Sequence, residues 1–494
     1  VNNEYTNEEL MFRGWTSPAE APLEQHRIAM AAHGLSVVEI ERVGRTGQWR
    51  LVRSGRRRYN RRVTASTPHL ISGPAAGHPL MRTAADPTGR KVLGTFGDCS
   101  GGTTPWGTTL HGEENVNGYF DASGPVDPSY EKGYARYGLP TTAKVNRAWS
   151  RVDERFDVAV HPNEPHRHGW IVELDPYDPD APPVKRTMLG RMKHEGATTT
   201  LTADGRVAVY LGDDERFDYQ YKFVSRDRYQ RGRDRHNRTL LDHGTLYVAR
   251  FLGDGTDDEE YDGLGQWVRL TSDERSYVPG MSVAEVLIHV RLAADAVGAT
   301  KMDRPEDVER NPVTGTVYLA CTNNTARTPE QVDEANPRAN NKHGHVIEID
   351  EDRNDAAAEL FRWRIFLVCG DPDDPTSFFG GYDKSKVSPI SCPDNVAFDG
   401  SGNLWISTDG NALGSNDGLF ATPVRGPERG HVKQFLTVPV HGEAVGPVIS
   451  ADQRTVFIGV QHPGETSGAS PDDPASRWPF GHQPRPAVAC VWKR

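Results

Sequence analysis

The chain is poor in cysteine and has no long hydrophobic run. Its five cysteines are odd in number and far apart, which excludes a disulfide framework and the close Cys and His spacings of zinc sites. No apolar stretch approaches the roughly 20 residues that span a bilayer, so we expect no membrane insertion. The sequence opens on Val1 with no visible signal peptide, and we interpret it as a trimmed product that has lost any targeting segment.

Several catalytic motifs are also missing. There is no Gly-x-Ser-x-Gly elbow for a serine nucleophile, and no glycine-rich loop of the kind that cradles nucleotide phosphates. The formal net charge is -11, which argues against nucleic acid as a partner and is typical of a protein that gathers cations. Arginine clusters at 56–62 and 226–238 depart from this trend, and we interpret both as solvated loops or hairpin tips.

Glycine and proline, by contrast, are abundant. With 49 Gly, 35 Pro and 36% hydrophobic residues, the composition favours many short strands over long helices. Hairpin patterns, in which an Asp- or Gly-rich turn joins two apolar strands, recur with large insertions. This recurrence predicts an all-β fold, a β-propeller of about six blades, although two barrels or a sandwich stack give a similar pattern. The hairpins cover 197–210, 307–320, 394–407 and 447–460.

No linker-like segment divides the chain, and we therefore predict a single domain over residues 1–494. Two insertions carry helix signals. The segment 23–32 is closed by a glycine, and 283–297 follows a Ser-x-x-Glu capping box. Helical or loop insertions are expected near 10–34, 225–243, 255–303 and 325–343.

Reactive side chains concentrate in the stretch 94–115. Cys99 is followed at once by Ser-Gly-Gly, which allows a sharp turn and a close approach of the backbone to another group. A predicted short strand at 106–110 leads to Glu113 and Glu114, and at most one of these neighbours should face the cysteine. A thiolate beside a carboxylate can bind metal, because thiolates suit transition metals and carboxylates also suit calcium. The alternative is a small buried apolar cysteine beside solvated glutamates.

Further carboxylates occupy equivalent places, where a hairpin begins or its outgoing strand ends. The inner strands of a propeller start from one face beside the central channel, so their first residues converge at its mouth. Converging carboxylates repel each other unless cations lie among them, which predicts a metal cluster. The alternatives are a turn role for Asp394 and a solvated loop tip for Glu465. The residues in question are Glu195, Glu306, Asp307, Asp394, Glu443 and Glu465.

Arg304 stands two residues before Glu306, and a fixed cation beside carboxylates suits an anion bound next to metals. Several of these stretches together resemble the PhoX family of bacterial alkaline phosphatases, in the right order along the whole chain. The family's early Asn-His-Glu-Tyr reads Asn2-Asn3-Glu4-Tyr5 here, and Asp98 stands where members often carry asparagine. The most specific match is Cys-x-Gly-Gly-x-Thr-Pro-Trp-Gly-Thr from Cys99; the others are 72–78, 113–115, 194–196, 304–307, 393–395 and 461–465.

The resemblance implies a propeller with a cluster of Fe3+ and Ca2+ ions at its mouth, and hydrolysis of phosphate monoesters. It also implies export in the folded state by the twin-arginine route, and hence a periplasmic or extracellular protein. Cys99 matches the family's iron-binding cysteine, and Arg304 its phosphate-binding arginine. The metal-bridging glutamates are matched by Glu195 and Glu306, and further ligands are expected among Glu113 or Glu114, Asp394, Glu443 and Glu465.

We therefore interpret the chain as a metal-dependent alkaline phosphatase with Cys99, Arg304 and Glu306 as catalytic residues. Its ligands would be small-molecule phosphate esters, without nucleic acid, and a monomer is the expected state. Two other classes stay open. A calcium-dependent propeller lactonase would need neither iron nor a thiolate, and a non-catalytic extracellular propeller would use its acids only to hold structural calcium.

Overall fold

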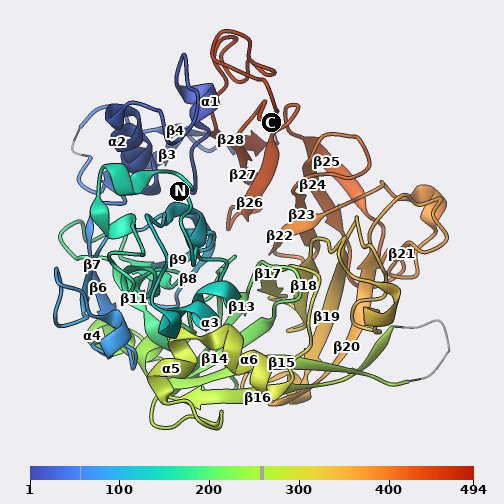
Figure 1. The fold of residues 1–494 in the computed structure, drawn as a ribbon. Coiled ribbons are helices and arrows are strands. Elements are labelled where there is room, and N and C mark those ends of the chain that lie inside the picture. Colours follow the sequence, from blue (N-terminus) through green and yellow to red (C-terminus); the bar gives the residue numbers. More distant parts are fainter. Residues whose placement is uncertain (56, 256–260, 494) are drawn as a thin grey trace.

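The computed structural model describes residues 1–55, 57–255 and 261–493, and in them strands far outnumber helices. The sheets are arranged around a common centre, and the last strands return to the side of the molecule where the chain begins (Figure 1). The all-β expectation is confirmed. Within the described residues, no helix combines the length and the apolar character needed to cross a lipid bilayer.

One strand from each structural unit lies toward the centre, and consecutive inner strands lie side by side. This is the propeller arrangement that the hairpin repeat predicts, because each hairpin supplies an inner strand and its outward neighbour. The predicted hairpins are all antiparallel strand pairs in the structure. The inner strands are β1 (Asn2–Asn3), β8 (Asp98–Thr103), β12 (Thr198–Leu201), β17 (Pro305–Arg310), β22 (Pro393–Phe398) and β26 (Glu443–Ile449).

The N-terminal part of the chain forms a small sheet, a separate hairpin and a six-stranded sheet. The small sheet pairs β1 with β2 (Gly34–Val37) and β5 (Arg61–Val63), and the hairpin is β3 (Ile40–Arg42) with β4 (Trp49–Leu51). The six-stranded sheet runs in the order β7 (Lys91–Leu93), β6 (Pro68–Ser72), β11 (Val184–Arg186), β10 (Ile171–Leu174), β9 (Thr109–Glu113) and β8.

The middle of the chain contributes two blades that join edge to edge through β16 and β20. The first is β12, β13 (Arg206–Gly212), β14 (Gln220–Arg228), β15 (Gly244–Gly253) and β16 (Asp262–Ser272). The second is β17, β18 (Val317–Cys321), β19 (His345–Glu351) and β20 (Leu360–Val368), with β21 (Phe378–Phe379) paired to β20.

Two smaller sheets complete the circle. One consists of β22, β23 (Leu404–Thr408), β24 (Gly418–Thr422) and β25 (Lys433–Thr437). The other consists of β26, β27 (Thr455–Gln461) and β28 (Ala487–Trp492).

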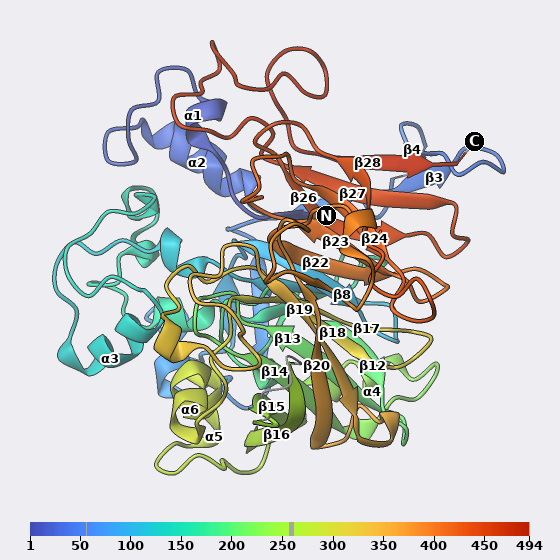
Figure 2. The same cartoon turned by 90° about the vertical axis from the view of Figure 1, so that its right-hand side faces the viewer.

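Most helices lie on one side of the molecule, and α4 with the β3–β4 hairpin lies on the other (Figure 2). The helix predicted at 23–32 is α2, with the same bounds, and the Ser282 capping box is present. The helix predicted at 283–297 is broken at His289, which ends α5 and caps α6. The helices are α1 (Glu8–Met11), α2 (Leu23–Ala32), α3 (Pro128–Arg136), α4 (Asp234–Asn237), α5 (Val283–Ile288) and α6 (Val290–Val297).

Two sequence expectations need correction. The strand expected at 106–110 begins only at Thr109, because residues 104–108 form a turn in which the Thr104 and Thr108 hydroxyls bond each other. The insertion expected near 255–303 contains the whole of β16, a full strand of the blade, and its residues 256–260 lie outside the described residues.

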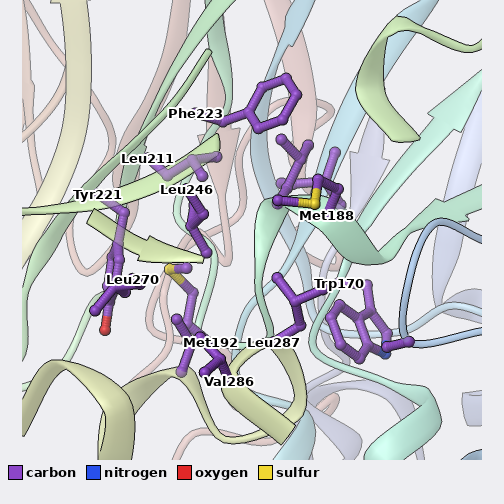
Figure 3. Packing of buried hydrophobic residues seen from close by; sticks show 14 of the residues in the cluster. Trp170, Met188, Met192, Leu211, Tyr221, Phe223, Leu246, Leu270, Val286 and Leu287 are labelled. Atoms are coloured by element: carbon purple, nitrogen blue, oxygen red, sulfur yellow. The ribbon is translucent and has the colours of Figure 1, made fainter. Parts of the chain in front are cut away.

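The largest hydrophobic cluster joins the inserted helices to the sheets. Leu287 of α5 packs with Trp170, Met192 and Leu246 in a fully buried group (Figure 3). Burial of such side chains stabilises the fold by about 1.5–3 kcal/mol each. This packing fixes the helix pair α5–α6 against the sheets at Met192, which lies shortly before the start of β12.

Candidate metal and phosphate site

The first residues of the inner strands meet at one end of the central channel. Cys99 is the second residue of β8, and Glu306 and Asp394 are the second residues of β17 and β22. Glu443 opens β26, and Glu195 precedes β12. Each side chain therefore owes its position to the same feature, a strand that begins beside the channel.

A left-handed turn recurs before these strands. The residue two positions before the candidate ligand has a positive φ in four of the strands, although only one of these residues is a glycine. Such conformations cost non-glycine residues about 1–3 kcal/mol and cluster at functional sites. The turns are at Gly97 (φ 64), Arg304 (φ 54), Cys392 (φ 54) and His441 (φ 54), before Cys99, Glu306, Asp394 and Glu443.

Six of the gathered acids and the Cys99 thiol fall into three overlapping groups, each compact enough for one ion to reach all of its ligand atoms. Within a group the ligand atoms lie within 4.8 Å of one another. Glu114 belongs to two groups and so does Glu195, so the three sites are continuous. The groups are Glu4, Cys99 and Glu114; Glu114, Glu195 and Asp214; and Glu195, Glu306 and Asp394.

Hydrogen bonds orient the central acids. The Cys99 thiol donates to Glu195 Oε1 at 3.3 Å, and Asn395 Nδ2 donates to the same oxygen at 2.8 Å. The hydroxyl of Thr322 donates to Glu306 Oε1 at 2.6 Å. Asn2 Nδ2 donates to the backbone carbonyl of Cys99, so the first strand of the chain also supports the site.

The electrostatics of the group favour bound cations. Burial and the charges of Glu195 and Glu4 raise the pKa of the Cys99 thiol well above its ordinary value. Burial and neighbouring carboxylates likewise raise the pKa values of Glu114 and Glu195. So many buried acids cannot all ionise unless positive charge lies among them. A set of carboxylates with one thiol fits a mixed cluster, because the thiol suits a transition metal and the carboxylates suit hard cations.

Arg304 provides the fixed positive charge of the site. Its Nε and Nη2 donate to the two oxygens of Asp214 at 2.7 and 2.8 Å, and Nη2 lies 3.0 Å from Glu306 Oε1. Burial opposes the charged form, but Asp214 and Glu306 raise the pKa of Arg304 well above its ordinary value. Its Nη1 makes no hydrogen bond to any part of the chain that the structure describes, and this donor is available to an anion.

Glu113 is directed away from the group, as the alternation of strand residues requires for one of the two neighbours. It accepts hydrogen bonds from Lys185 Nζ at 2.6 Å and from the backbone N–H groups of Gly169 and Trp170. Burial alone would raise the pKa of Glu113, but Lys185 and His168 lower it to about 2. Both carboxylate oxygens of Glu113 therefore have partners inside the blade, and of these two neighbouring glutamates only Glu114 joins the candidate ligands.

Glu443 and Glu465 lie beside the three groups and are bridged by His462. His462 Nε2 lies 3.0 Å from Glu443, and its Nδ1 lies 3.2 Å from Glu465. Tyr5 and Asn7 donate to the two oxygens of Glu465 at 2.6 and 2.9 Å. These glutamates form an outer layer of the mouth, joined to the N-terminal segment.

Sequence reasoning did not single out Glu4, Asp214 or Asp409 as site residues. Asp214 follows the end of β13, the outgoing strand of its hairpin, which is the same signal that identified Glu465. Asp409 follows the end of β23 in the same way, and its charge raises the pKa values of Glu306 and Asp394. The aligned motif at 2–5 contained Glu4, but its two-residue strand offered no pattern to interpret.

Glycines let neighbouring blades approach each other beside the ligands. A Cβ on Gly112 of β9 would lie 2.3 Å from the carbonyl oxygen of His194, next to Glu195. A Cβ on Gly212 of β13 would lie 1.9 Å from the carbonyl oxygen of Glu306 itself. Real Cβ atoms do not approach so closely, so the spacing of the candidate ligands depends on glycine at both positions.

A propeller whose inner strands bring buried carboxylates, a thiol and an arginine to one mouth belongs to the class of metal-dependent propeller hydrolases. The family model for alkaline phosphatase PhoX matches residues 1–464. The chain belongs to this family, and it is accordingly a phosphohydrolase that acts on phosphate esters.

A solved structure agrees with this assignment. Pseudomonas fluorescens PhoX in complex with vanadate, a transition state analogue, matches with a TM-score of 0.88 and 42% sequence identity. That match covers 100% of this chain and 85% of the solved one. The extracellular domain of a hybrid two-component system from B. thetaiotaomicron has a TM-score of 0.20 at 12% identity and does not bear on the fold. Among curated proteins no match is found.

Proposed function

We propose that the protein hydrolyses phosphate monoesters at a multinuclear metal cluster in the propeller mouth. The single observation that carries this proposal is the chain of three ligand groups linked through Glu114 and Glu195. Shared carboxylates are what a cluster of adjacent ions needs, because each oxygen of a bridging group can serve a different ion.

The ligand set suggests which ions the cluster takes. Cys99 would hold a transition metal, which we propose is Fe3+, and the carboxylate-only groups would hold Ca2+. When bound, such ions withdraw charge from the phosphoryl oxygens and supply an activated water for hydrolysis. The proposed ligands are Glu4, Cys99, Glu114, Asp214, Glu195, Glu306 and Asp394, with Asp409, Glu443 and Glu465 in the outer layer.

Arg304 would bind the substrate phosphate. Its bonds to Asp214 fix the plane of the guanidinium, and the free Nη1 can donate to a phosphoryl oxygen. A preorganised cation of this kind stabilises the charge that develops on the phosphoryl oxygens during transfer. Replacement by Lys would keep the charge but lose the fixed fork. We therefore expect Arg304→Lys to lower kcat/KM for a phosphate ester by about tenfold or more.

The proposal extends to the setting of the enzyme. The family resemblance supports export to the periplasm or the extracellular space. The single circle of sheets supports one domain over residues 1–494, and we propose that it acts as a monomer.

The other two classes considered from the sequence use part of the same geometry. A calcium-dependent lactonase or a non-catalytic calcium-binding propeller would explain the carboxylates. Neither needs the thiol of Cys99 within bonding distance of Glu195, nor the arginine clamped on Asp214. The family membership also favours the phosphatase.

One pair of measurements tests the proposal. Purified protein is assayed with a chromogenic phosphate ester before and after treatment with a chelator, and its metals are determined by elemental analysis. We expect activity that the chelator abolishes, together with bound iron and calcium. Calcium alone without phosphatase activity would point to the other two classes, and phosphatase activity in fully metal-free protein would overturn the cluster.

A further inference from the structure

Two neighbouring segments carry Glu195 and Asp214 to the mouth, and each is held from outside by the inserted helices. The first is 191–195, which precedes β12, and the second is 213–215, which follows β13. Both lie outside the named strands, and their backbone contacts with the sheets are short: His194 and Glu195 donate to the carbonyls of Glu113 and Gly212. Further partners come from α5 and α6 and from one buried carboxylate.

That carboxylate is Asp213, which is fully buried and is not among the proposed ligands. Its Oδ1 accepts a hydrogen bond from the backbone N–H of Lys193 at 3.0 Å. In return the backbone N–H of Asp214 donates to the carbonyl of Lys193 at 3.0 Å. Asp213 thus ties the two segments together one residue from Asp214 and two from Glu195.

Arg291, the second residue of α6, binds the carboxylate of Asp213 through its guanidinium group. Its Nε donates to Asp213 Oδ2 at 2.8 Å, and its Nη2 donates to Asp213 Oδ1. Its Nη1 lies 3.4 Å from Asp218 Oδ2, so the guanidinium fork is saturated by acids. The side chain is 2% exposed, and a bidentate pair of this kind is both strong and geometrically specific.

The helix that delivers Arg291 is itself anchored. Arg136 of α3 donates to both Asp295 of α6 and Asp218, and the Tyr219 hydroxyl donates to Asp295. On the α5 side, the backbone N–H of Arg191 donates to the carbonyl of Leu287 at 2.9 Å. The side chain of Leu287 is itself buried in the largest hydrophobic cluster, together with Met192 and Leu246 (Figure 3).

From this geometry we infer that Arg291 is a positioning residue for the metal cluster. It acts through Asp213 to fix Glu195 and Asp214, and the α5–α6 insertion is the clamp that holds those two ligands in register. The inference rests on the proposed function, because it assumes that these acids bind metal. It predicts that loss of the Arg291–Asp213 pair loosens the metals before it disturbs the rest of the fold.

The test removes both charges together, so that no unpaired charge is left buried. The variant is Asp213→Asn with Arg291→Met. The matched control is Lys222→Met with Glu351→Gln, which removes a pair that is equally buried, with its charged atoms 2.6 Å apart, and that belongs to none of the three ligand groups. Both variants are loaded with iron and calcium and then dialysed against increasing chelator, and the retained metal is measured by elemental analysis.

Loss of a supporting partner of a ligand typically costs 10–100-fold in metal affinity. We therefore expect the Asp213/Arg291 variant to release half of its metal at a chelator concentration about tenfold lower than wild type needs, and the control to match wild type. Arg291→Lys should fall between them, because an ammonium can replace part of the fork. KM and kcat of the metal-loaded proteins provide a second readout.

The outcomes separate the two proposals. If wild type binds metal and the Asp213/Arg291 variant retains it as firmly as the control, the positioning role of Arg291 is wrong and the proposed function stands. If wild type itself holds no metal, the proposed function fails and the positioning role fails with it. Equal loosening in the variant and the control would show a general effect of stability, and that result would also overturn the inference.

Discussion

Glu113 and Glu114 are neighbours in the chain and have opposite environments. Glu113 faces the blade interior, where Lys185 pairs with it, whereas Glu114 faces the mouth among other acids. Their pKa values are therefore shifted in opposite directions: the pKa of Glu113 is lowered to about 2, and the pKa of Glu114 is raised. At the residue scale, the partner of each carboxylate decides whether it is structural or available to a metal.

The thiol of Cys99 is the clearest single-residue test. If it binds a transition metal, Cys99→Ala should lose iron and activity together, with kcat/KM reduced at least about 100-fold. Iron content and kcat/KM are measured on the same preparation. Cys321→Ala is the control, since this cysteine is fully buried in a strand and belongs to none of the three ligand groups; it should keep both.

Glu309 offers a pH-dependent prediction. Burial and the charge of Asp307 raise its pKa from 4.5 to about 8, so the folded protein binds a proton that the unfolded chain releases between these values. Stability due to this group is therefore present below about pH 4.5 and is lost as the pH rises to 8. Because the side chain is only half-buried, we expect Glu309→Gln to gain about 1–2 kcal/mol at pH 9.

Urea unfolding of wild type and Glu309→Gln at pH 5 and pH 9 measures this gain. The two proteins should differ little at pH 5, where the wild-type carboxyl is protonated and resembles the amide. If Glu309→Gln gained the same free energy of unfolding at pH 5 and at pH 9, the gain could not come from the titration of Glu309.

At the scale of elements, neighbouring blades approach each other through glycine beside the candidate ligands. Gly112 and Gly212 each face a backbone carbonyl of the next blade at a distance that excludes a side chain. Four of the inner strands also start from left-handed turns, which direct the following residues into the channel. The positions of the candidate ligands are therefore set by the turns and the close backbone contacts at the ends of the inner strands.

Gly212→Ala should disturb the site more than the fold. The new methyl group would meet the carbonyl oxygen of Glu306 at 1.9 Å and push β17 away from β13. Overpacking of this kind costs about 1–3 kcal/mol, and a ligand displaced by about 1 Å can lose about 100-fold in rate. Activity and melting temperature are measured together.

Gly205→Ala, in the turn before the same strand, is the control. Its Cβ would meet nothing within 4 Å, and only the strain at φ +86 would be felt. It should lose about 1 kcal/mol of stability and keep full activity. Full activity in Gly212→Ala as well would mean that the blade contact does not set the ligand spacing.

At the scale of the whole molecule, the cluster joins segments that are far apart in the chain. Glu4, Cys99, Glu195 and Glu306 lie in or next to the inner strands of different blades, so bound cations would fasten the circle where the acids otherwise repel. An ion present at 100 times its Kd stabilises by about 2.7 kcal/mol. Removal of several ions should therefore weaken the entire fold.

Thermal unfolding with and without chelator measures this effect. We expect one cooperative transition, lowered by at least about 5 °C when the metals are removed and restored when they are returned. Two separated transitions would contradict a single domain. An unchanged melting temperature would contradict cations that bridge the sheets.

The sequence by itself determined the kind of fold, several of its strands and helices, and most of the residue types that form the candidate site. The hairpin patterns and the glycine and proline content predicted the all-β propeller, and the signals at 23–32 and Ser282 predicted helices that are present. Cys99, Glu195, Glu306 and Asp394 were singled out as candidate ligands because the start of an inner strand has a local pattern, and the structure brings them together in the three groups. Local patterns depend only on near neighbours in the chain, so sequence can encode them directly.

The tertiary structure decided what depends on distant partners. Lys185 sets Glu113 apart from Glu114, and Arg304 brings Asp214 into the site. The insertion at 283–297 gave no sign in sequence that it would supply Arg291 to Asp213. These choices follow from which charges and backbone groups meet when the circle of blades closes, and no single segment contains that information.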